Sequence, residues 1–327
     1  MTATETGFGF KAAWYVAATS AEVTDRPLPR TVLGVPLVLF RTREGVGALL
    51  DRCPHRGVPL SLGFVKGGAL HCGYHGWSFD TGGSCTAVPG LLDPTPNPAR
   101  CVTGYPVREQ QGHVWVWMDP TQEPVGEPFT FRLADAPGYL TVRKQLDAPG
   151  GLLAVAENAL DVPHTPFVHA GLFRSEGDRN EITCVIERTR DRVEVEYIGE
   201  PRPEGIVARI LSPSGGIVTH FDRFHLPCIV EVEYRIGEEN HIVLNAACTP
   251  VTPDSTRLYA VVSVRSRVPT WLVRPIVQPA ALYIFSQDVK ILGEQTRMAA
   301  TFGDRYLSTE IDLLGPHIAR LLNRAER

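Results

Sequence analysis

Residues 53–75 begin with Cys53-Pro54-His55 and end with Cys72-Gly73-Tyr74-His75, and sixteen residues separate the two short segments. Each segment carries one thiol and one imidazole. Both lie in a glycine- and proline-rich part of the chain, where the backbone turns sharply and approaches a bound group closely. The stretch therefore predicts two loops that present two cysteines and two histidines to one metal centre.

Two kinds of metal centre use this set of ligands. A structural zinc ion is bound tetrahedrally, usually by one closely spaced pair of cysteines and one of histidines. A Rieske [2Fe–2S] cluster has two cysteines on one iron and two histidines on the other. Here each loop supplies one residue of each type, two apart in the first loop and three apart in the second. The spacing favours the cluster, and zinc is the alternative.

The string Cys72-Gly73-Tyr74-His75-Gly76-Trp77 resembles the Rieske domain of the Rieske non-haem iron oxygenases. Respiratory Rieske proteins carry an additional cysteine in each loop, whereas Val58 and Tyr74 stand at those positions here. The oxygenases often have proline where this chain has Gly73. The resemblance implies that the cluster is held by Cys53, His55, Cys72 and His75.

A second stretch, residues 157–169, contains two histidines five residues apart, His164 and His169. A predicted helix ends at Asp161 because two prolines follow it. Two imidazoles and one carboxylate form the facial triad of non-haem Fe(II) oxygenases, but His-x4-His alone is more often structural. With Asn158, the stretch matches the family pattern Asn-x2-Asp-x2-His-x4-His. The resemblance implies that both histidines bind iron.

Asp288 is the candidate for the third iron ligand. It lies in an apolar stretch of a predicted helix over residues 280–299. An unpaired carboxylate buried there would be costly, and metal coordination would remove that cost. The oxygenases place their carboxylate ligand on such a C-terminal helix. An aspartate on the solvent face is the alternative, and Glu294 is the second candidate ligand.

The resemblance gives Asp161 a separate, catalytic role. In the family this carboxylate links a cluster histidine of the neighbouring subunit to an iron-binding histidine, which implies His75 of one chain and His164 of the next. Because the cluster and the iron of one chain lie too far apart in the family, a ring of subunits is implied. We expect a homotrimer of this chain alone. A structural aspartate at the helix end is the alternative.

The sequence predicts an α+β fold with two domains, residues 1–125 and 126–327. The first reads as an all-β Rieske domain with strands near residues 14–18, 32–40, 47–50 and 112–118, and residues 120–128 read as a linker. The second reads as a curved antiparallel sheet with helices over residues 152–160, 280–299 and 308–324, in agreement with the family's helix-grip catalytic domain. Its strand-like runs cover residues 181–187, 192–198, 205–211, 217–224, 229–235, 241–248 and 257–265.

The composition limits the partners and the compartment. The 327 residues include 32 basic and 36 acidic ones, a net charge of −4 without a basic patch, so we expect no nucleic-acid partner. The first ten residues lack a signal-peptide pattern, and prolines interrupt the most apolar stretch, residues 268–285, so a membrane span is not expected. Seven cysteines without a disulfide framework suit a reducing cytoplasm.

These observations and the resemblance predict the terminal oxygenase of a Rieske system, with a [2Fe–2S] cluster and a mononuclear Fe(II) as cofactors. No flavin or NAD(P)H motif is present, so a separate flavin-dependent NAD(P)H reductase, a ferredoxin or both must deliver electrons. Arg56 and Lys66 lie near the cluster loops, where they are placed to meet an acidic partner.

A short chain without a β subunit resembles the monooxygenating and demethylating branches of the family. We therefore expect O2-dependent hydroxylation or oxidative demethylation of a mostly apolar organic substrate. Residues 206–208, 217–218 and 242–244 are the predicted apolar lining of its cavity, and His220 and His225 read either as substrate contacts or as structural histidines. The alternatives are an aromatic cis-dihydroxylating dioxygenase and a Rieske electron-transfer protein with an inactive second domain.

Overall fold

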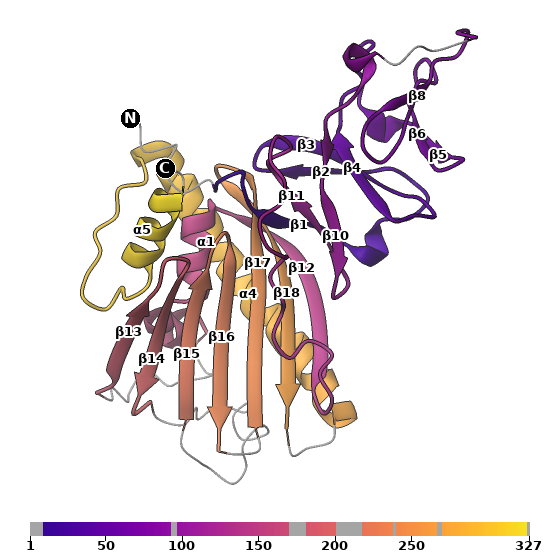
Figure 1. Cartoon of the computed structure of the whole chain (residues 1–327). Coiled ribbons are helices and arrows are strands. Elements are labelled where there is room, and N and C mark those ends of the chain that lie inside the picture. The colour runs from indigo at the N-terminus through magenta and orange to yellow at the C-terminus, as the bar shows by residue number, and fades with distance from the viewer. Residues whose placement is uncertain are drawn as a thin grey trace. The chain divides into compact units, whose positions relative to one another are not determined.

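The computed structural model describes residues 9–92, 97–169, 181–200, 218–237, 240–266 and 270–325. By its internal contacts the chain separates into two compact units, one of residues 10–130 and one that contains residues 131–327. Figure 1 shows the elements of both units. The α+β class predicted from the sequence is confirmed, since the first unit is nearly all strand and the second combines one large sheet with helices.

The first unit is built from small antiparallel sheets. One sheet has the order β1 (Trp14–Thr19), β11 (His113–Trp117), β10 (Val107–Gln110). A second has the order β2 (Leu28–Val32), β3 (Val35–Arg41), β4 (Val46–Leu50), β9 (Gly104–Tyr105). The third, which carries the cluster loops, has the order β5 (Phe64–Lys66), β6 (Ala69–His71), β7 (Ser78–Phe79), β8 (Cys85–Ala87).

The strand predicted within residues 32–40 corresponds to β3. It is preceded by a turn at Leu33 and Gly34, whose φ angles are +51° and +71°. Two successive residues with positive φ form the tight turn that joins twisted antiparallel strands. The turn connects β2 to β3 as a hairpin, with Val32 opposite Val35.

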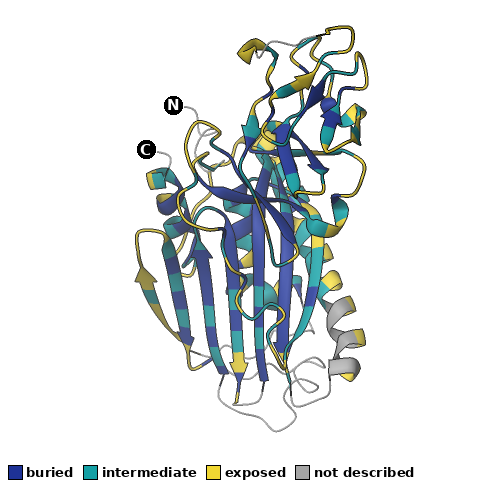
Figure 2. Cartoon of the chain, turned by 45° about the vertical axis from the view of Figure 1, so that its right-hand side comes forward, coloured by how far each residue is buried: buried dark blue, intermediate teal, exposed yellow. Residues whose placement is uncertain are grey.

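The second unit contains a seven-stranded antiparallel sheet. Its order is β12 (Leu140–Pro149), β18 (Ser255–Arg265), β17 (Asn240–Thr252), β16 (Ile229–Ile236), β15 (Val218–His225), β14 (Arg192–Ile198), β13 (Thr183–Arg188). The middle strands are buried along most of their length, whereas β13 at the edge is exposed (Figure 2). The sequence did not predict β12, and the strand predicted over residues 205–211 lies outside the described residues.

The second unit also contains three longer helices, α1 (Leu152–Ala159), α4 (Thr270–Phe302) and α5 (Gly315–Ala325). α4 runs across one face of the sheet (Figure 1) and begins ten residues before its predicted start, with Pro275 and Pro279 inside it. α5 begins seven residues after its predicted start. No helix among the described residues is long and apolar enough to cross a membrane.

Candidate metal centres

The two loops that carry the Cys53 and Cys72 segments have the same backbone hydrogen bonds. The N–H of Cys53 donates to the carbonyl of Val58 at 2.8 Å, and the N–H of Gly57 donates to the carbonyl of Cys53 at 2.9 Å. The second loop repeats both bonds from Cys72, at 2.8 and 3.0 Å, with Gly76 in the place of Gly57. These glycines have φ angles of +74° and +71°, which other residues rarely adopt. Equivalent glycines thus give the two loops equivalent turns.

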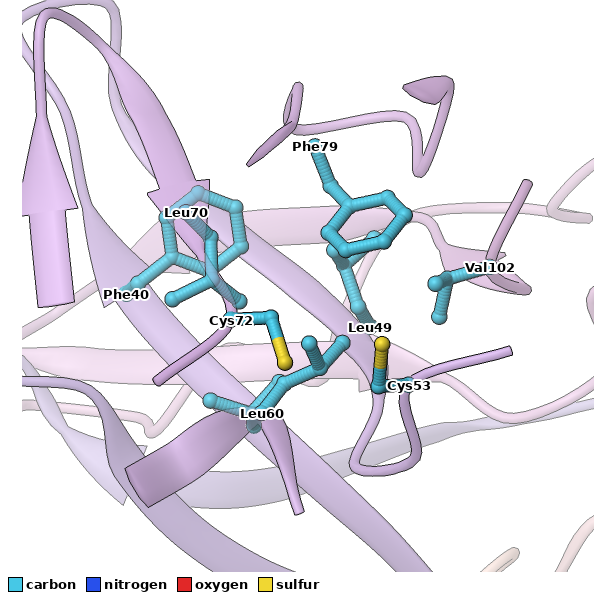
Figure 3. Packing of buried hydrophobic residues seen from close by; sticks show 9 residues of the cluster. Phe40, Leu49, Cys53, Leu60, Leu70, Cys72, Phe79 and Val102 are labelled. Atoms are coloured by element: carbon cyan, nitrogen blue, oxygen red, sulfur yellow. The ribbon is translucent and has the colours of Figure 1, made fainter. Parts of the chain in front are cut away.

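The two thiols lie together in the interior of the first unit. Cys53 and Cys72 are each 2% exposed and belong to the same buried cluster. Figure 3 shows both sulfurs among aliphatic and aromatic side chains of the surrounding strands. Burial, together with the neighbouring Cys72, raises the pKa of the Cys53 thiol. Without a metal to hold the thiolate form, this environment favours the neutral thiol of Cys53.

The two imidazoles form the outer part of the same centre. The ring centroids of His55 and His75 are 4.5 Å apart, and His55 stacks on Trp77 at 4.8 Å with nearly parallel planes. His75 is exposed, whereas Nδ1 of His55 is buried and has no hydrogen-bond partner. Inner thiols, outer imidazoles and an orphaned ring nitrogen fit a cluster with cysteines on one iron and histidines on the other.

Glycines also allow the two loops to approach each other closely. A Cβ atom on Gly73 would lie 2.6 Å from the carbonyl oxygen of Leu62, and one on Gly63 would lie 1.9 Å from that of His71. Real Cβ atoms do not approach backbone oxygens this closely. Because proline also carries a Cβ atom, this contact explains why the chain has Gly73 where the oxygenases often have proline.

Three side chains of the second unit converge on one point. His164 ends a short 3-10 helix (Val162–His164), His169 follows α2 (Thr165–Val168), and Asp288 projects from α4. The two Nε2 atoms are 3.2 Å apart, and Oδ1 of Asp288 lies 3.5 Å from that of His164 and 3.1 Å from that of His169. In an octahedral site, two neighbouring ligand atoms that each lie about 2.1 Å from the metal are about 3 Å from each other. The three atoms therefore outline one face of an octahedral site.

Oxygen atoms lie behind both rings. Nδ1 of His169 lies 3.0 Å from Oε1 of Gln287, whereas Nδ1 of His164 faces Oδ2 of Asp161 at 3.5 Å without a hydrogen bond. The amide oxygen of Gln287 accepts, so Nδ1 of His169 donates to it and its Nε2 faces the other two side chains. Oδ1 of Asp288 is buried without a hydrogen-bond partner. Two imidazole nitrogens and one carboxylate oxygen that converge on one point fit a metal cation.

The electrostatics of this site also favour a cation. Burial alone would lower the pKa of His164, but the carboxylates of Asp161 and Asp288 outweigh it and raise that pKa to about 9. Burial alone would raise the pKa of Asp288, and the neighbouring imidazoles of His164 and His169 lower it instead. The site therefore has a negative potential that a metal ion would neutralise.

A cavity of about 280 Å³ adjoins the three side chains. Apolar residues of the sheet and of α4 form most of its wall, and His164, His169 and Asp288 open into it. Of the predicted lining, Ile242 and Leu244 contribute to the wall, whereas residues 206–208 and 217 lie outside the described residues.

The other candidate residues lie at different places relative to the three converging side chains. Glu294, the second candidate ligand, is exposed and pairs with Arg297 at 2.7 Å, away from the three converging side chains. The side chain of Asp161 is 32% exposed and lines the cavity. Sequence reasoning missed Gln287, although its position beside Asp288 was the available signal. It also missed Glu200 and Asp222, which line the same cavity.

Two protein-family models match the chain, in successive segments. The model of the Rieske [2Fe-2S] domain matches residues 13–101. The model of the vanillate O-demethylase oxygenase C-terminal domain matches residues 151–327, which is more than half of the 327 residues.

Curated proteins and solved structures agree with these matches. The vanillate O-demethylase oxygenase subunit of Pseudomonas sp. is 39% identical over 174 residues, 49% of this chain and 45% of the relative. The oxygenase component of dicamba O-demethylase from Stenotrophomonas maltophilia is 39% identical over 159 residues, 48% of this chain and 47% of the relative. The chain thus spans about half the length of these curated relatives. A crystal structure of dicamba monooxygenase bound to dicamba superposes with a TM-score of 0.83 at 25% identity, covering 97% of this chain and 98% of that chain.

Proposed function

Because the chain belongs to the Rieske non-haem iron oxygenases whose catalytic domain is of the vanillate O-demethylase type, we propose that it is the terminal oxygenase of a multicomponent system. We propose that it hydroxylates or oxidatively demethylates a mostly apolar organic substrate. The cofactors are a Rieske [2Fe–2S] cluster and a mononuclear non-haem iron. When bound, they supply electrons and open coordination positions for O2.

Two of the curated relatives favour demethylation over the other reactions. Both are oxygenase parts of O-demethylases. In O-demethylation, a methoxy compound, O2, two electrons and two protons give the free hydroxyl compound, formaldehyde and water. The observation that carries the proposal is the convergence of two imidazole nitrogens, from His164 and His169, and one carboxylate oxygen, from Asp288, at an apolar cavity. An inactive second domain would not need to keep this arrangement.

The chain's own residues have three tasks in this reaction. Cys53, His55, Cys72 and His75 would hold the cluster. The triad of His164, His169 and Asp288 would hold the iron, and Asp161 and Gln287 would fix the ring orientation of the two histidines through their Nδ1 atoms. The apolar wall would exclude water and hold the substrate beside the iron.

We propose a homotrimer in which Asp161 joins His164 to His75 of a neighbouring chain. Two observations support this arrangement. Asp161 faces His164 with one oxygen while its side chain is 32% exposed, and His75 is exposed on its own unit. A carboxylate between two imidazoles would give electrons a short hydrogen-bonded path between chains.

We propose that a flavin-dependent NAD(P)H reductase, a ferredoxin or both donate the electrons in the cytoplasm. Arg56 and Lys66 are exposed, as are the large side chains of Leu62 and Tyr74 in the same stretch of the chain. Such a surface suits a transient, partly electrostatic contact with an acidic protein. All seven cysteines are free, which suits a reducing compartment.

The reaction is tested with a surrogate reductase and ferredoxin, NADH, O2 and a panel of aryl methyl ethers. We expect formaldehyde and the free phenol in equal amounts, with one O2 consumed for each. Asp161→Asn should lower turnover more than a hundredfold while both metal centres remain loaded. Glu187→Gln, at an exposed carboxylate of β13, is the control. Reduction of the cluster without any oxygenated product from the panel would contradict the proposal.

A further inference from the structure

The two histidines of the cluster loops have different surroundings. The ring of His55 stacks on that of Trp77, with centroids 4.8 Å apart and planes 5° from parallel. The ring of His75 instead has a tilted contact with Tyr74, at 3.9 Å and 46°, and Tyr74 is 62% exposed. His55 is half-buried, whereas His75 is exposed. One imidazole is therefore covered by a large ring, and the other faces solvent.

Trp77 is fixed within the second loop and the core. Its carbonyl oxygen accepts a hydrogen bond from the N–H of Cys72 at 2.8 Å. Its side chain packs against the buried cluster of the first unit that contains Cys53 and Cys72. Because the indole also stacks on His55, a residue of the second loop holds an imidazole of the first loop.

The first loop has no aromatic ring at the matching place. The N–H of Cys53 donates to the carbonyl of Val58, as that of Cys72 donates to the carbonyl of Trp77. Val58 and Trp77 therefore occupy equivalent positions in two loops with the same turn. An isopropyl group has no ring face to offer an imidazole, so the two loops differ in sequence at the position that covers a histidine.

A parallel stack fixes the plane of the His55 ring, because tilting the imidazole would press its edge into the indole. Nδ1 of His55 is buried and has no hydrogen-bond partner among the described residues. No hydrogen bond therefore orients this nitrogen, and the stack on Trp77 is what sets its direction.

His71 provides a contrast in the same unit. It stacks on Phe64 in the same way, with centroids 5.0 Å apart and planes 1° from parallel. Its Nδ1, however, lies 2.8 Å from Oγ of Ser78, and its Nε2 lies 3.1 Å from the carbonyl oxygen of Lys66. Hydrogen bonds at both nitrogens hold that ring, so it does not depend on its stack.

We propose that Trp77 is a positioning residue for the cluster, which holds His55 in the orientation that binds iron and shields that side of the cluster from water. The inference rests on the proposed function, because it assumes that His55 is a cluster ligand. Its consequence is a lower reduction potential, which makes the reduced cluster a stronger electron donor.

The direction of this effect follows from the charge of the cluster. Two ferric ions, two sulfides and two thiolates sum to zero with neutral imidazoles, and reduction of one iron adds one negative charge. Water stabilises a charged form more than an apolar ring does. Exposure of the His55 side to water would therefore favour the reduced form and raise the potential.

An EPR-monitored redox titration of the holoprotein at one pH tests the inference. Trp77→Leu removes the ring face and keeps an apolar side chain, so we expect the reduction equilibrium to shift at least about tenfold, or 59 mV for one electron, to higher potential. Trp77→Phe restores a ring and should stay within about threefold of the parent protein. Should Trp77→Leu not retain its cluster, Trp77→Met takes its place with the same expectation.

Two control variants show whether the effect is specific to this stack. Phe64→Leu removes the equivalent ring from His71, which hydrogen bonds still hold, and Tyr74→Ala uncovers an imidazole that already faces solvent. Each should shift the equilibrium less than about threefold. The inference is overturned if Trp77→Leu shifts it no more than these controls do.

Pulsed EPR of the reduced cluster assigns the effect to one histidine. Each imidazole contributes one nitrogen coupling, and Trp77→Leu should change one of the two couplings and leave the other as in the parent protein. A purely structural role of Trp77 would lower the melting temperature and leave both couplings and the potential unchanged, which would overturn the inference.

The parent protein separates this inference from the proposed function. A parent protein without a Rieske spectrum would contradict the proposed function and the inference with it. A parent protein with that spectrum, whose potential does not respond to Trp77→Leu, would contradict the inference and leave the proposed function standing.

Discussion

The cluster loops and the site of His164, His169 and Asp288 gather their side chains differently. The loops take all four from residues 53–75, and paired glycines set the backbone of both. The other site combines two histidines on one bend with an aspartate 119 residues after His169, from a helix that crosses the sheet. The first arrangement depends on local backbone geometry, whereas the second depends on how α4 packs.

This difference predicts that the two sites respond differently to substitution. A substitution in the loops should destabilise the first unit as a whole, because the thiols are part of its core with Leu60, Leu70 and Phe79. A defect at the other site should empty that site and leave the fold, because its ligands lie at the edge of a cavity. The following variants test this contrast.

Cys72→Ser should have the largest effect. It removes a cluster ligand and leaves a polar hydroxyl in a buried, apolar environment, so the cluster should be lost and the first unit should unfold more easily. Visible absorption and iron content measure the loss. Cys85→Ser, outside the loops, should keep the colour. A variant of Cys72 that keeps a Rieske spectrum would show that the loops do not hold the cluster.

Asp288→Ala should remove the mononuclear iron and lower turnover more than about a hundredfold, while the cluster spectrum and the melting temperature of the first unit stay unchanged. Metal analysis and EPR of the reduced protein measure this. Glu294→Ala is the matched control on the same helix, because Glu294 pairs with Arg297 at the surface. Equal loss of iron in both variants would contradict the assignment of Asp288, and not Glu294, as the iron ligand.

Gly63→Ala should destabilise the first unit by about 3 kcal/mol, because the new Cβ atom would press on the carbonyl oxygen of His71 and separate the loops. Urea unfolding followed by the visible absorption of the cluster measures it. Gly82→Ala, where the nearest atom is an ordinary 3.5 Å away, is the control in the same unit. Equal stability of both variants would contradict the close approach of the loops.

Acid should destabilise the second unit through His225. Burial, with Arg192 and Arg223 nearby, lowers the pKa of His225 from 6.5 to about 4. Well above pH 6.5 the ring is neutral in the folded and in the unfolded chain. Between pH 6.5 and pH 4 only the unfolded chain takes up the proton, so the free energy of unfolding decreases as the pH is lowered through this window. The loss is about 2 kcal/mol at pH 5. Urea unfolding at pH 7 and pH 5 should show a smaller difference for His225→Gln, and an equal difference would exclude His225 as the cause.

Gln287→Leu should have the smallest effect, a roughly tenfold weaker binding of the mononuclear iron, because the Nδ1–H of His169 loses its acceptor. Competition with a chelator measures the affinity. Gln287→Glu keeps an acceptor and should bind the iron at least as well as the parent. Equal weakening in both variants would show that the contact with His169 does not orient the ring.

The fold could be predicted wherever the sequence pattern is local. Strands β14 and β16 follow clear alternation, and α1 lies between recognisable ends. β12 was missed because a strand at the sheet edge tolerates the charged pair Arg143-Lys144 and a final proline. The start of α4 was missed because two prolines read as breakers, although the packed helix continues through them.

The residues of the candidate sites could likewise be predicted only where their sequence pattern is local. The loop residues could be named from spacing, whereas the pair His164 and His169 needed the family pattern around it, and the role of all of them as ligands stays a prediction. Asp288 needed the family resemblance, since no local pattern connects it to the histidines. Glu200 was missed because it lies 20 residues before His220 and beyond the end of β14, whereas Asp222 follows His220 by two residues on β15.

Iron, zinc and acid-labile sulfide per chain, with an EPR spectrum of the dithionite-reduced protein, test the central claim most directly. Two separate centres predict three irons, two sulfides and a Rieske-type signal. Two irons with two sulfides, even after reconstitution with Fe(II), would contradict the site of His164, His169 and Asp288. Zinc without sulfide would contradict both centres and the oxygenase proposal with them.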